Sequence, residues 1–367
     1  MKPIFFIIPL AVLLFFAGDC NKLTDPPPPV QAKTWHWSVD TLVYDWLGAP
    51  PDQVQLLSVW GSSPHDVWAA GQSDVVFGEL WHYNGVRWRP VKDWPFSGID
   101  SGGSYINDVY CVAGFDSTNV FVFGIHGYDT TGSDLVLKWD GRKWGTVPWK
   151  EGKAPFGGLG YGVAQNKTKL WAMSTTGHAV KYENGFLSVE PTITGYRSTG
   201  PTIAALNNGD VYVNAVRDSV LVERPQGTRT QLFKRDIGGT WTMVEDKFMA
   251  GGDYDGNGLG RGIWGVGDVL FANNRGFWRR IGSGWERLTT MSNVGGVCFT
   301  NQNDWWAYFN RDIWHYDQNG WAAVNVDILN KYPNHFLGGN GWSDGNEIFI
   351  SLSNDGRENF MLHGKLL

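Results

Sequence analysis

The chain contains several imperfect copies of one sequence repeat. The clearest copy runs Ser58-Val-Trp-Gly-Ser-Ser-Pro-His-Asp-Val-Trp-Ala-Ala-Gly71, then Leu80-Trp-His-Tyr-Asn-Gly85, then Trp88-Arg-Pro-Val91. Its first segment holds two apolar runs separated by a turn, and the other two segments add a third and a fourth run. Self-similarity at a fixed period indicates one supersecondary unit stacked on copies of itself. The passage therefore predicts a unit of four short strands.

Later segments repeat this order of apolar runs at a period of about forty to fifty residues, which is typical of a β-propeller blade. The second copy, from Asp108, and the sixth, from Gly296, are plain. The fourth copy resembles the repeat only weakly, and its last strand is either Thr230 to Phe233 or Thr240 to Val244. No segment after the N-terminus has sustained helical spacing. The chain is predicted to be an all-β, seven-bladed β-propeller.

The two ends of the chain are predicted to share the last blade. The seventh copy begins at Gly341 and supplies three strands before Leu367. An unpaired strand edge invites aggregation. Thr34-Trp-His-Trp-Ser-Val39 alternates as a strand does and has no partner strands before it. We expect this N-terminal strand to complete the last blade and to close the ring.

The residues before this strand have a different composition. Met1-Lys2, the apolar run Ile4 to Phe16 and Ala17-Gly-Asp-Cys20 follow the order of a secretory signal, and the run is short for a mature membrane span. The position of Cys20 resembles the lipidated Cys of bacterial lipoproteins, although Asp19 departs from the usual small residue; simple secretion is the alternative. The predicted segments are a lipoprotein-type signal peptide with its anchor Cys (1–20), a Pro-rich linker (21–33) and the propeller (34–367).

The repeat resembles that of secreted bacterial β-propeller lipoproteins and, more loosely, kelch-like and sialidase-like repeats. The resemblance rests on the Trp60 to Gly71 passage with Trp81-His-Tyr-Asn-Gly85 and Trp88-x-x-Val91, and it extends from about Trp35 to Leu367. It implies a propeller in the bacterial cell envelope or outside the cell, held by its lipid anchor. It implies no activity, because propellers host binding, scaffolding and several chemistries.

Composition narrows the classes of partner. The net charge of -6 gives no basic face for nucleic acid. Cys111 and Cys298 are predicted to be small buried side chains in blades that are not neighbours, too far apart for a disulfide. We expect a monomer.

No catalytic motif is found. Ser353 to Phe360 approaches a sialidase-type Asp box but has the wrong spacing. Asp66, Asp210, Asp268 and Asp304 recur just before second strands and are interpreted as turn caps. An enzyme stays open as an alternative, in the form of a glycan-cleaving hydrolase or lyase with acids at the channel mouth.

One Gly-rich segment begins like a calcium loop. Asp253, Asp255 and Asn257 alternate as the first three oxygen ligands of such a loop do. Arg261 stands at a further ligand position, and its charge opposes a tight site. The segment is either a calcium site or a Gly-rich turn, and no other cofactor is predicted.

Aromatic and basic residues outside the repeated strands form the candidate binding site. Trp46, Trp94 and Trp149 follow the outermost strands of three consecutive blades, so they are predicted in neighbouring loops on one face. Loops between second and third strands should share this face, because chain direction alternates within a blade. In the last four blades we expect these loops to carry Arg217, Arg275, Arg311 and Arg357.

An arc of Trp opposite an arc of Arg suits an anionic glycan or an acidic peptide, because guanidinium groups pair with carboxylate or sulfate. The alternatives are Trp side chains that fill gaps between blades and Arg side chains that are simply solvated. The predicted function is an extracytoplasmic binding module for a glycan, a protein or another acidic ligand. A structural envelope scaffold that binds other proteins is the third alternative.

Overall fold

The structure of the 367-residue chain is a computed structural model. It describes residues 34–42, 54–73, 79–91, 107–126, 133–151, 159–166, 168–174, 177–190, 203–221, 224–250, 259–260, 262–274, 276–289, 294–309, 311–318, 320–354 and 358–367. The predicted signal peptide, Cys20 and the linker lie outside these residues.

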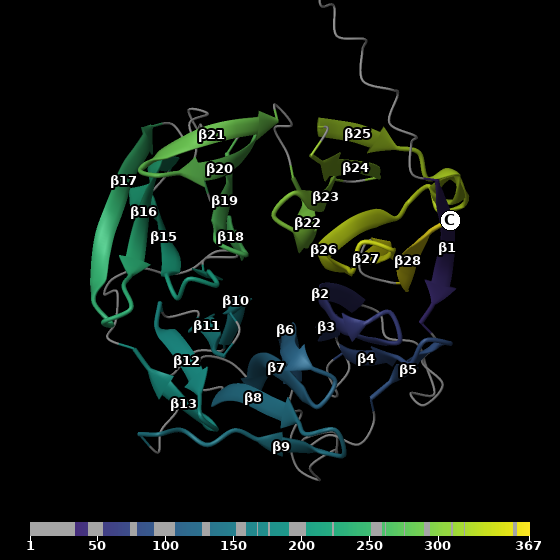
Figure 1. The fold of residues 1–367 in the computed structure, drawn as a ribbon, viewed down its shortest axis with the longest axis horizontal. Coiled ribbons are helices and arrows are strands. Elements are labelled where there is room, and N and C mark those ends of the chain that lie inside the picture. The colour runs from purple at the N-terminus through teal and green to yellow at the C-terminus, as the bar shows by residue number, and fades with distance from the viewer. Residues whose placement is uncertain are drawn as a thin grey trace, which may run out of the picture.

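Short strands dominate the described residues and form sheets arranged radially around one axis (Figure 1). Five sheets have four antiparallel strands each. The first three, each from the axis outward, are β6 (Asn107–Asp116), β7 (Asn119–His126), β8 (Ser133–Trp139) and β9 (Trp144–Thr146); β10 (Leu159–Gln165), β11 (Leu170–Ser174), β12 (Ala179–Glu183) and β13 (Phe186–Val189); and β14 (Ile203–Ala205), β15 (Val211–Leu221), β16 (Arg224–Arg235) and β17 (Trp241–Ala250). The other two are β18 (Ile263–Val266), β19 (Val269–Asn273), β20 (Phe277–Ile281) and β21 (Gly284–Thr289); and β22 (Gly296–Asn301), β23 (Asp304–Phe309), β24 (Asp312–Asp317) and β25 (Gly320–Val324).

The sixth sheet has eight strands in the order β1-β28-β27-β26-β2-β3-β4-β5. One half consists of β2 (Val54–Ser63), β3 (Asp66–Ser73), β4 (Glu79–Tyr83) and β5 (Trp88–Pro90). The other half consists of β26 (Phe336–Ser343), β27 (Glu347–Asn354), β28 (Glu358–Leu366) and β1 (Trp35–Thr41). All strands among the described residues lie between Trp35 and Leu366.

The predicted all-β propeller is confirmed, but the prediction of seven separate blades is corrected. Five blades are separate sheets, and the first and last repeat units are merged into one. A single parallel pair, Ser58 with Asn340, joins the innermost strands β2 and β26. Gly339 has a φ of 65°, and a Cβ on it would lie 2.7 Å from the carbonyl oxygen of Leu57. The missing side chain therefore lets the two backbones approach.

The N-terminal strand occupies the outermost place of its half-sheet. β1 pairs antiparallel with β28, from Trp35 opposite Leu366 to Thr41 opposite Phe360. The ring of Trp35 also meets Trp306 of β23 edge-on, with centroids 4.8 Å apart. The predicted pairing between the two ends of the repeat region is confirmed.

The core is divided into clusters between neighbouring sheets, where aromatic rings fill much of the space. Trp68 and Trp144 meet edge-on across one such interface with centroids 5.4 Å apart. Cys111 and Cys298 are free thiols, as predicted, and burial raises the pKa of Cys111 to about 11. The described residues include a single 3-10 helix, Asp327–Lys331, and no helix long and apolar enough to cross a bilayer.

Candidate interaction surface

The β14–β17 sheet departs most from the repeat. β15 has 11 residues and β16 has 12, which makes them the longest strands described. Their antiparallel register continues from Val211 opposite Arg235 to Leu221 opposite Arg224. The sequence left two alternatives for the fourth strand of this unit. The structure shows that it is β17, from Trp241 to Ala250, which pairs with β16. Thr230 to Phe233 belongs to the third strand, β16.

Arg217 lies within β15, opposite Arg229 of β16. Its expected place in a loop is wrong, because both strands continue beyond the point where the repeat predicts a turn. Arg229 donates through Nε to Oδ1 of Asp246 on β17, 2.7 Å away, and its Nη2 also bonds to Oδ2 of Asp246. The amide of Gln231 donates to Oδ2 of Asp246 at 3.0 Å. The bond from Arg229 is the main reason that the pKa of Asp246 is lowered, so its carboxylate is charged and already paired.

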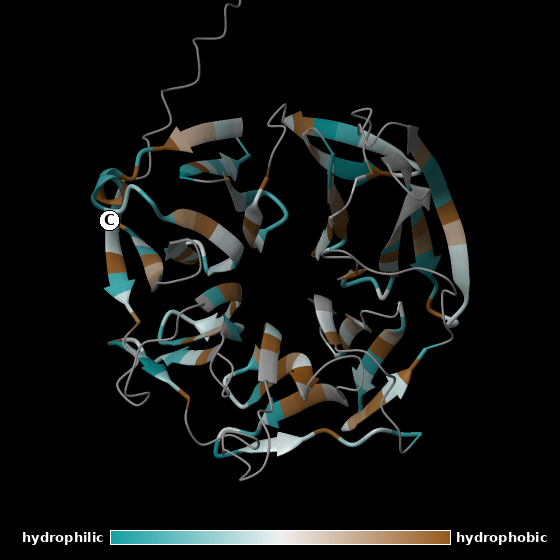
Figure 2. Ribbon diagram, turned by 180° about the vertical axis from the view of Figure 1, so that it is seen from behind, coloured by the Kyte–Doolittle hydropathy of each residue, from teal (hydrophilic) through white to brown (hydrophobic). Residues whose placement is uncertain are grey.

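β17 is the outermost strand of this sheet and pairs only with β16. It has 10 residues, whereas the other outermost strands have between 3 and 7. Apolar side chains are exposed along it: Phe248 at 58%, Met243 at 49% and Val244 at 39%. Figure 2 shows hydrophobic bands along this strand at the rim of the ring. An edge strand presents backbone N–H and C=O groups that can accept a further strand.

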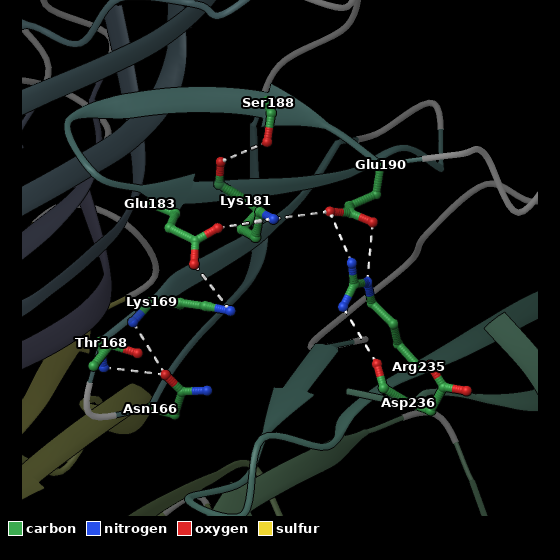
Figure 3. A network of polar contacts seen from close by, with 9 residues as sticks. All are labelled: Asn166, Thr168, Lys169, Lys181, Glu183, Ser188, Glu190, Arg235 and Asp236. Atoms are coloured by element: carbon green, nitrogen blue, oxygen red, sulfur yellow. Dashed lines mark hydrogen bonds and ion pairs between the residues drawn. The ribbon is translucent and has the colours of Figure 1, made fainter. Parts of the chain in front are cut away.

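The sheet is tied to its neighbour on one side by a buried ion pair. Arg235, the last residue of β16, donates to both carboxylate oxygens of Glu190, at 3.0 and 3.3 Å (Figure 3). The Glu190 side chain is 9% exposed, and Lys181 approaches it at 3.4 Å. Arg235 also lies over the ring of Trp171, 5.2 Å from its centroid. This network links the β10–β13 sheet to the root of the long hairpin.

A second link holds β17 against the next sheet. Glu245 accepts a bond from Nη1 of Arg280 on β20 at 2.8 Å and from Nε1 of Trp285 on β21 at 2.9 Å. The guanidinium of Arg280 lies 5.1 Å from the centroid of the Trp285 ring. The second link therefore holds β17 directly, whereas the first holds its partner strand β16, and both acidic residues of β17 are engaged.

A repeated pair of side chains crosses between second and third strands in every unit. An aromatic residue on the second strand is always opposite a cationic or imidazole side chain on the third. The pairs are Trp68 with His82, Phe121 with Lys138, Trp171 with Lys181, Tyr212 with Lys234, Phe271 with Arg279, Trp306 with His315 and Phe349 with His363.

Carboxylates at the start of second strands hold several of these partners. Nε2 of His82 lies 2.7 Å from Asp66, and that of His315 lies 2.9 Å from Asp304. Lys234 lies 2.8 Å from Asp210. Besides their place at the turn, Asp66, Asp210 and Asp304 thus each pair with a side chain on the adjacent third strand, which the interpretation as turn caps did not predict. In the sequence, each of these Asp residues stands two residues before the aromatic residue of its second strand. The residue with which each Asp pairs on the third strand becomes evident only from the register of the two strands.

Only some residues of the predicted Trp and Arg arcs lie in the part of the chain that the structure describes. Trp149 is partly buried against the cluster between the β6–β9 and β10–β13 sheets and forms a parallel bridge with Leu187. This favours the gap-filling alternative for Trp149. Arg311 donates to the carbonyl of Pro333 at 3.0 Å and also bonds to that of Leu329, so it fixes the 3-10 segment. The remaining predicted residues, outside the described ones, are Trp46, Trp94, Arg275, Arg357, Asp253, Asp255 and Asn257.

Among the described residues, no group of three or more His, Cys, Asp or Glu side chains is suited to a metal ion. The predicted calcium segment lies outside them, so a calcium site stays a prediction.

No protein-family model matches the chain, and no curated protein matches its sequence. Solved structures do match. "YCF48 bound to D1 peptide" is 14% identical with a TM-score of 0.57, over 90% of this chain and 95% of that one. "YCF48 from Cyanidioschyzon merolae" is 15% identical with a TM-score of 0.53, over 89% and 98%. The extracellular domain of the putative hybrid two component system BT4673 from B. thetaiotaomicron is 14% identical with a TM-score of 0.51, over 89% of this chain and 40% of that one. What the chain shares with these proteins is the β-propeller fold.

Proposed function

We propose that the chain is a peptide-binding propeller, in which the outer edge of β17 accepts an extended segment of a partner protein as an added strand. The observation that carries this proposal is the 10-residue outermost strand with exposed Met243, Val244 and Phe248. Strand addition draws affinity from main-chain hydrogen bonds and specificity from alternate side chains.

The chemistry of the edge favours a peptide with alternating apolar residues. Glu245 and Asp246 are already paired with Arg280 and Arg229, so their charges are partly compensated before a ligand arrives. The link through Glu245 holds β17 in place and the link through Arg235 holds its partner strand β16, which lowers the ordering cost of binding.

The comparisons support a protein ligand only by analogy. YCF48, which has the same fold, is bound to a D1 peptide in one solved structure, and at 14% identity the likeness extends to the fold alone. We further propose that the chain works in the cell envelope with Cys20 as its lipid anchor, and that the two halves of the eight-stranded sheet act as two blades of a seven-unit ring. These proposals rest on the N-terminal sequence and on the repeat. A glycan ligand at Trp46, Trp94 and Trp149 stays a prediction.

The test is selection from a displayed library of linear peptides against residues 34–367. Selected peptides should alternate apolar and polar residues, and the double variant Met243→Lys, Phe248→Lys should weaken their binding by about tenfold or more, because charges replace the apolar contacts. Ile237→Lys is the matched control, since Ile237 is exposed and apolar but lies in the turn before β17. Peptides that bind the double variant as well as the unchanged protein would contradict the proposal.

A further inference from the structure

We propose that the outer edge of β17 pairs with β17 of a second copy of this chain, and that this two-fold pairing regulates the peptide site. The regulatory part rests on the proposed function, because the backbone edge that would accept a peptide is engaged until the two copies separate. An equilibrium between monomer and dimer then takes the place of the monomer expected from the sequence.

Symmetry limits how two copies of one strand edge can meet antiparallel. A two-fold axis perpendicular to the sheet reverses the strand direction and keeps the two faces of the sheet, so each face of one sheet continues into the same face of the other. Residues directly opposite each other must therefore come from the same face of β17. Every contact then occurs twice, and the assembly closes as a dimer.

One face of β17 carries an acid and a base two residues apart. Glu245 lies on the face that meets the β18–β21 sheet, where it accepts a bond from Nη1 of Arg280 at 2.8 Å. Lys247 lies on the same face, because side chains alternate along a strand and the pairing with β16 is regular over these residues. This face therefore presents both signs of charge to a neighbouring strand.

The opposite face of β17 is mostly apolar. The amide of Gln231 donates to Oδ2 of Asp246 at 3.0 Å and to the sulfur of Met243 at 3.3 Å, so both residues lie on this face. Phe248 follows Asp246 by two residues and shares the face. Val244 has no partner on β16, because the register shifts at this point. It is the extra residue of a bulge.

A two-fold axis through Asp246 places complementary side chains opposite each other. Glu245 of each copy is then opposite Lys247 of the second copy, which gives two pairs of opposite charge. On the other face, Met243 and the bulged Val244 lie beside Phe248 of the second copy. Pairs of opposite charge and pairs of an aromatic with an apolar side chain both stabilise neighbouring strands. The edge of β17 is therefore complementary to itself in this register.

Within residues 243–248, the one pair of like charges in this register is Asp246 with its own copy. Each of these carboxylates accepts from Nε of Arg229 at 2.7 Å and from Gln231 at 3.0 Å, so a guanidinium accompanies each one to the axis. An axis through Glu245 or Lys247 would place that charge opposite itself and would form no Glu–Lys pair. Charge complementarity thus favours the axis through Asp246.

The edge is open to a second ring. Met243, Val244 and Phe248 are 49%, 39% and 58% exposed, so neither neighbouring sheet covers them, and β17 lies at the outer rim (Figure 1). One pair of strands makes a small interface, for which we expect a Kd of about 10 µM. Such a dimer is mostly dissociated at about 1 µM, so a peptide can compete for the edge.

The first test is sedimentation velocity of the protein from about 1 to about 100 µM, a range that brackets the expected Kd. We expect a dimer that forms with rising concentration. Lys247→Glu should weaken it by about tenfold or more, because each new carboxylate would be opposite Glu245 of the second copy. Arg89→Glu is the matched control, since Arg89 is an exposed cation on another outermost strand, β5. A protein that stays monomeric, or equal association of the two variants, would overturn the proposal.

A second measurement does not depend on the stability of Lys247→Glu. An axis through residue 246 brings its two copies directly opposite each other, with Cα atoms about 4.5–5.5 Å apart, within the range of a disulfide. Treatment with diamide should therefore crosslink Asp246→Cys above the level of the unchanged protein. Thr242→Cys is the control, because Thr242 is exposed on the same strand but four residues from the axis. Equal crosslinking of both variants, or none of Asp246→Cys, would overturn the pairing.

The regulatory role is tested on the same variant. Selected peptides should bind reduced Asp246→Cys at least about tenfold more tightly than the crosslinked form, because the crosslink holds the edge closed. Equal binding would overturn the regulation. A monomeric protein that binds selected peptides would overturn the dimer and leave the proposed function standing. A dimer that meets both tests while no peptide is selected would support the pairing and overturn the proposed function.

Discussion

Trp68 and His82 stack nearly face to face, with ring centroids 4.0 Å apart and an angle of 23° between their planes. Asp66 accepts a bond from Nε1 of Trp68 at 3.0 Å, and its Oδ1 lies 2.7 Å from Nε2 of His82. The same acid, aromatic ring and imidazole recur in Asp304, Trp306 and His315. This triplet joins the second and third strands through side chains as well as through the backbone.

Asp66→Asn should destabilise the protein at neutral pH and not at low pH. Burial alone would raise the pKa of Asp66, but hydrogen bonds from His82 and Ser62 lower it below its usual value. A lowered folded-state pKa gives stability that is present above the unfolded pKa of about 3.9 and is lost as pH falls further. We expect a loss of roughly 1–2 kcal/mol at pH 7 that shrinks below about pH 4, measured by urea unfolding. A difference that does not change with pH would speak against this role.

Glu190→Ala should be among the most damaging single changes outside the apolar core. It leaves Arg235 partly buried without its partner, at a cost of roughly 3 kcal/mol. Lys169→Ala is the control, because the pair of Lys169 with Glu183 is about one-third exposed and should be worth less than about 1 kcal/mol. Denaturant unfolding of both variants checks this. Equal small losses would mean that the network in Figure 3 contributes little to stability.

Gly339→Ala tests the joint between the two halves of the eight-stranded sheet. A methyl group there would lie 2.7 Å from the carbonyl oxygen of Leu57, on a residue with φ of 65°. We expect a loss of roughly 1–3 kcal/mol. Gly338→Ala is the matched control, since a Cβ on Gly338 would meet nothing within 4 Å. Thermal unfolding that shows the same stability for both variants would contradict the account of the joint.

Cys111 should react slowly in the folded protein. With its pKa raised to about 11, only about one thiol in a thousand is ionised at pH 8, and the thiolate is the reactive form. Mass spectrometry after iodoacetamide treatment should find Cys111 and Cys298 unmodified in the native protein and both modified in denaturant. Rapid native labelling of Cys111 would show that the site is open and its thiol ionised.

The repeat predicts strands well in the copies whose sequence stays similar to the first one. Trp88, Trp144 and Trp321 all fall in outermost strands, and the alternation of Trp35 to Val39 is enough to place β1. It fails in the fourth copy, because charged residues such as Arg224, Arg229 and Lys234 interrupt the apolar pattern of β16. The interaction edge on β17 and the triplets depend on cross-strand register, and no spacing in the sequence defines the register of a long hairpin.

Hydrogen exchange measured by mass spectrometry, with and without a selected peptide, tests the central claim most directly. If the peptide adds as a strand, the amides of residues 241–250 should exchange more slowly in the complex, because outward N–H groups of β17 gain acceptors. Protection confined to other sheets, with residues 241–250 unchanged, would contradict strand addition at this edge.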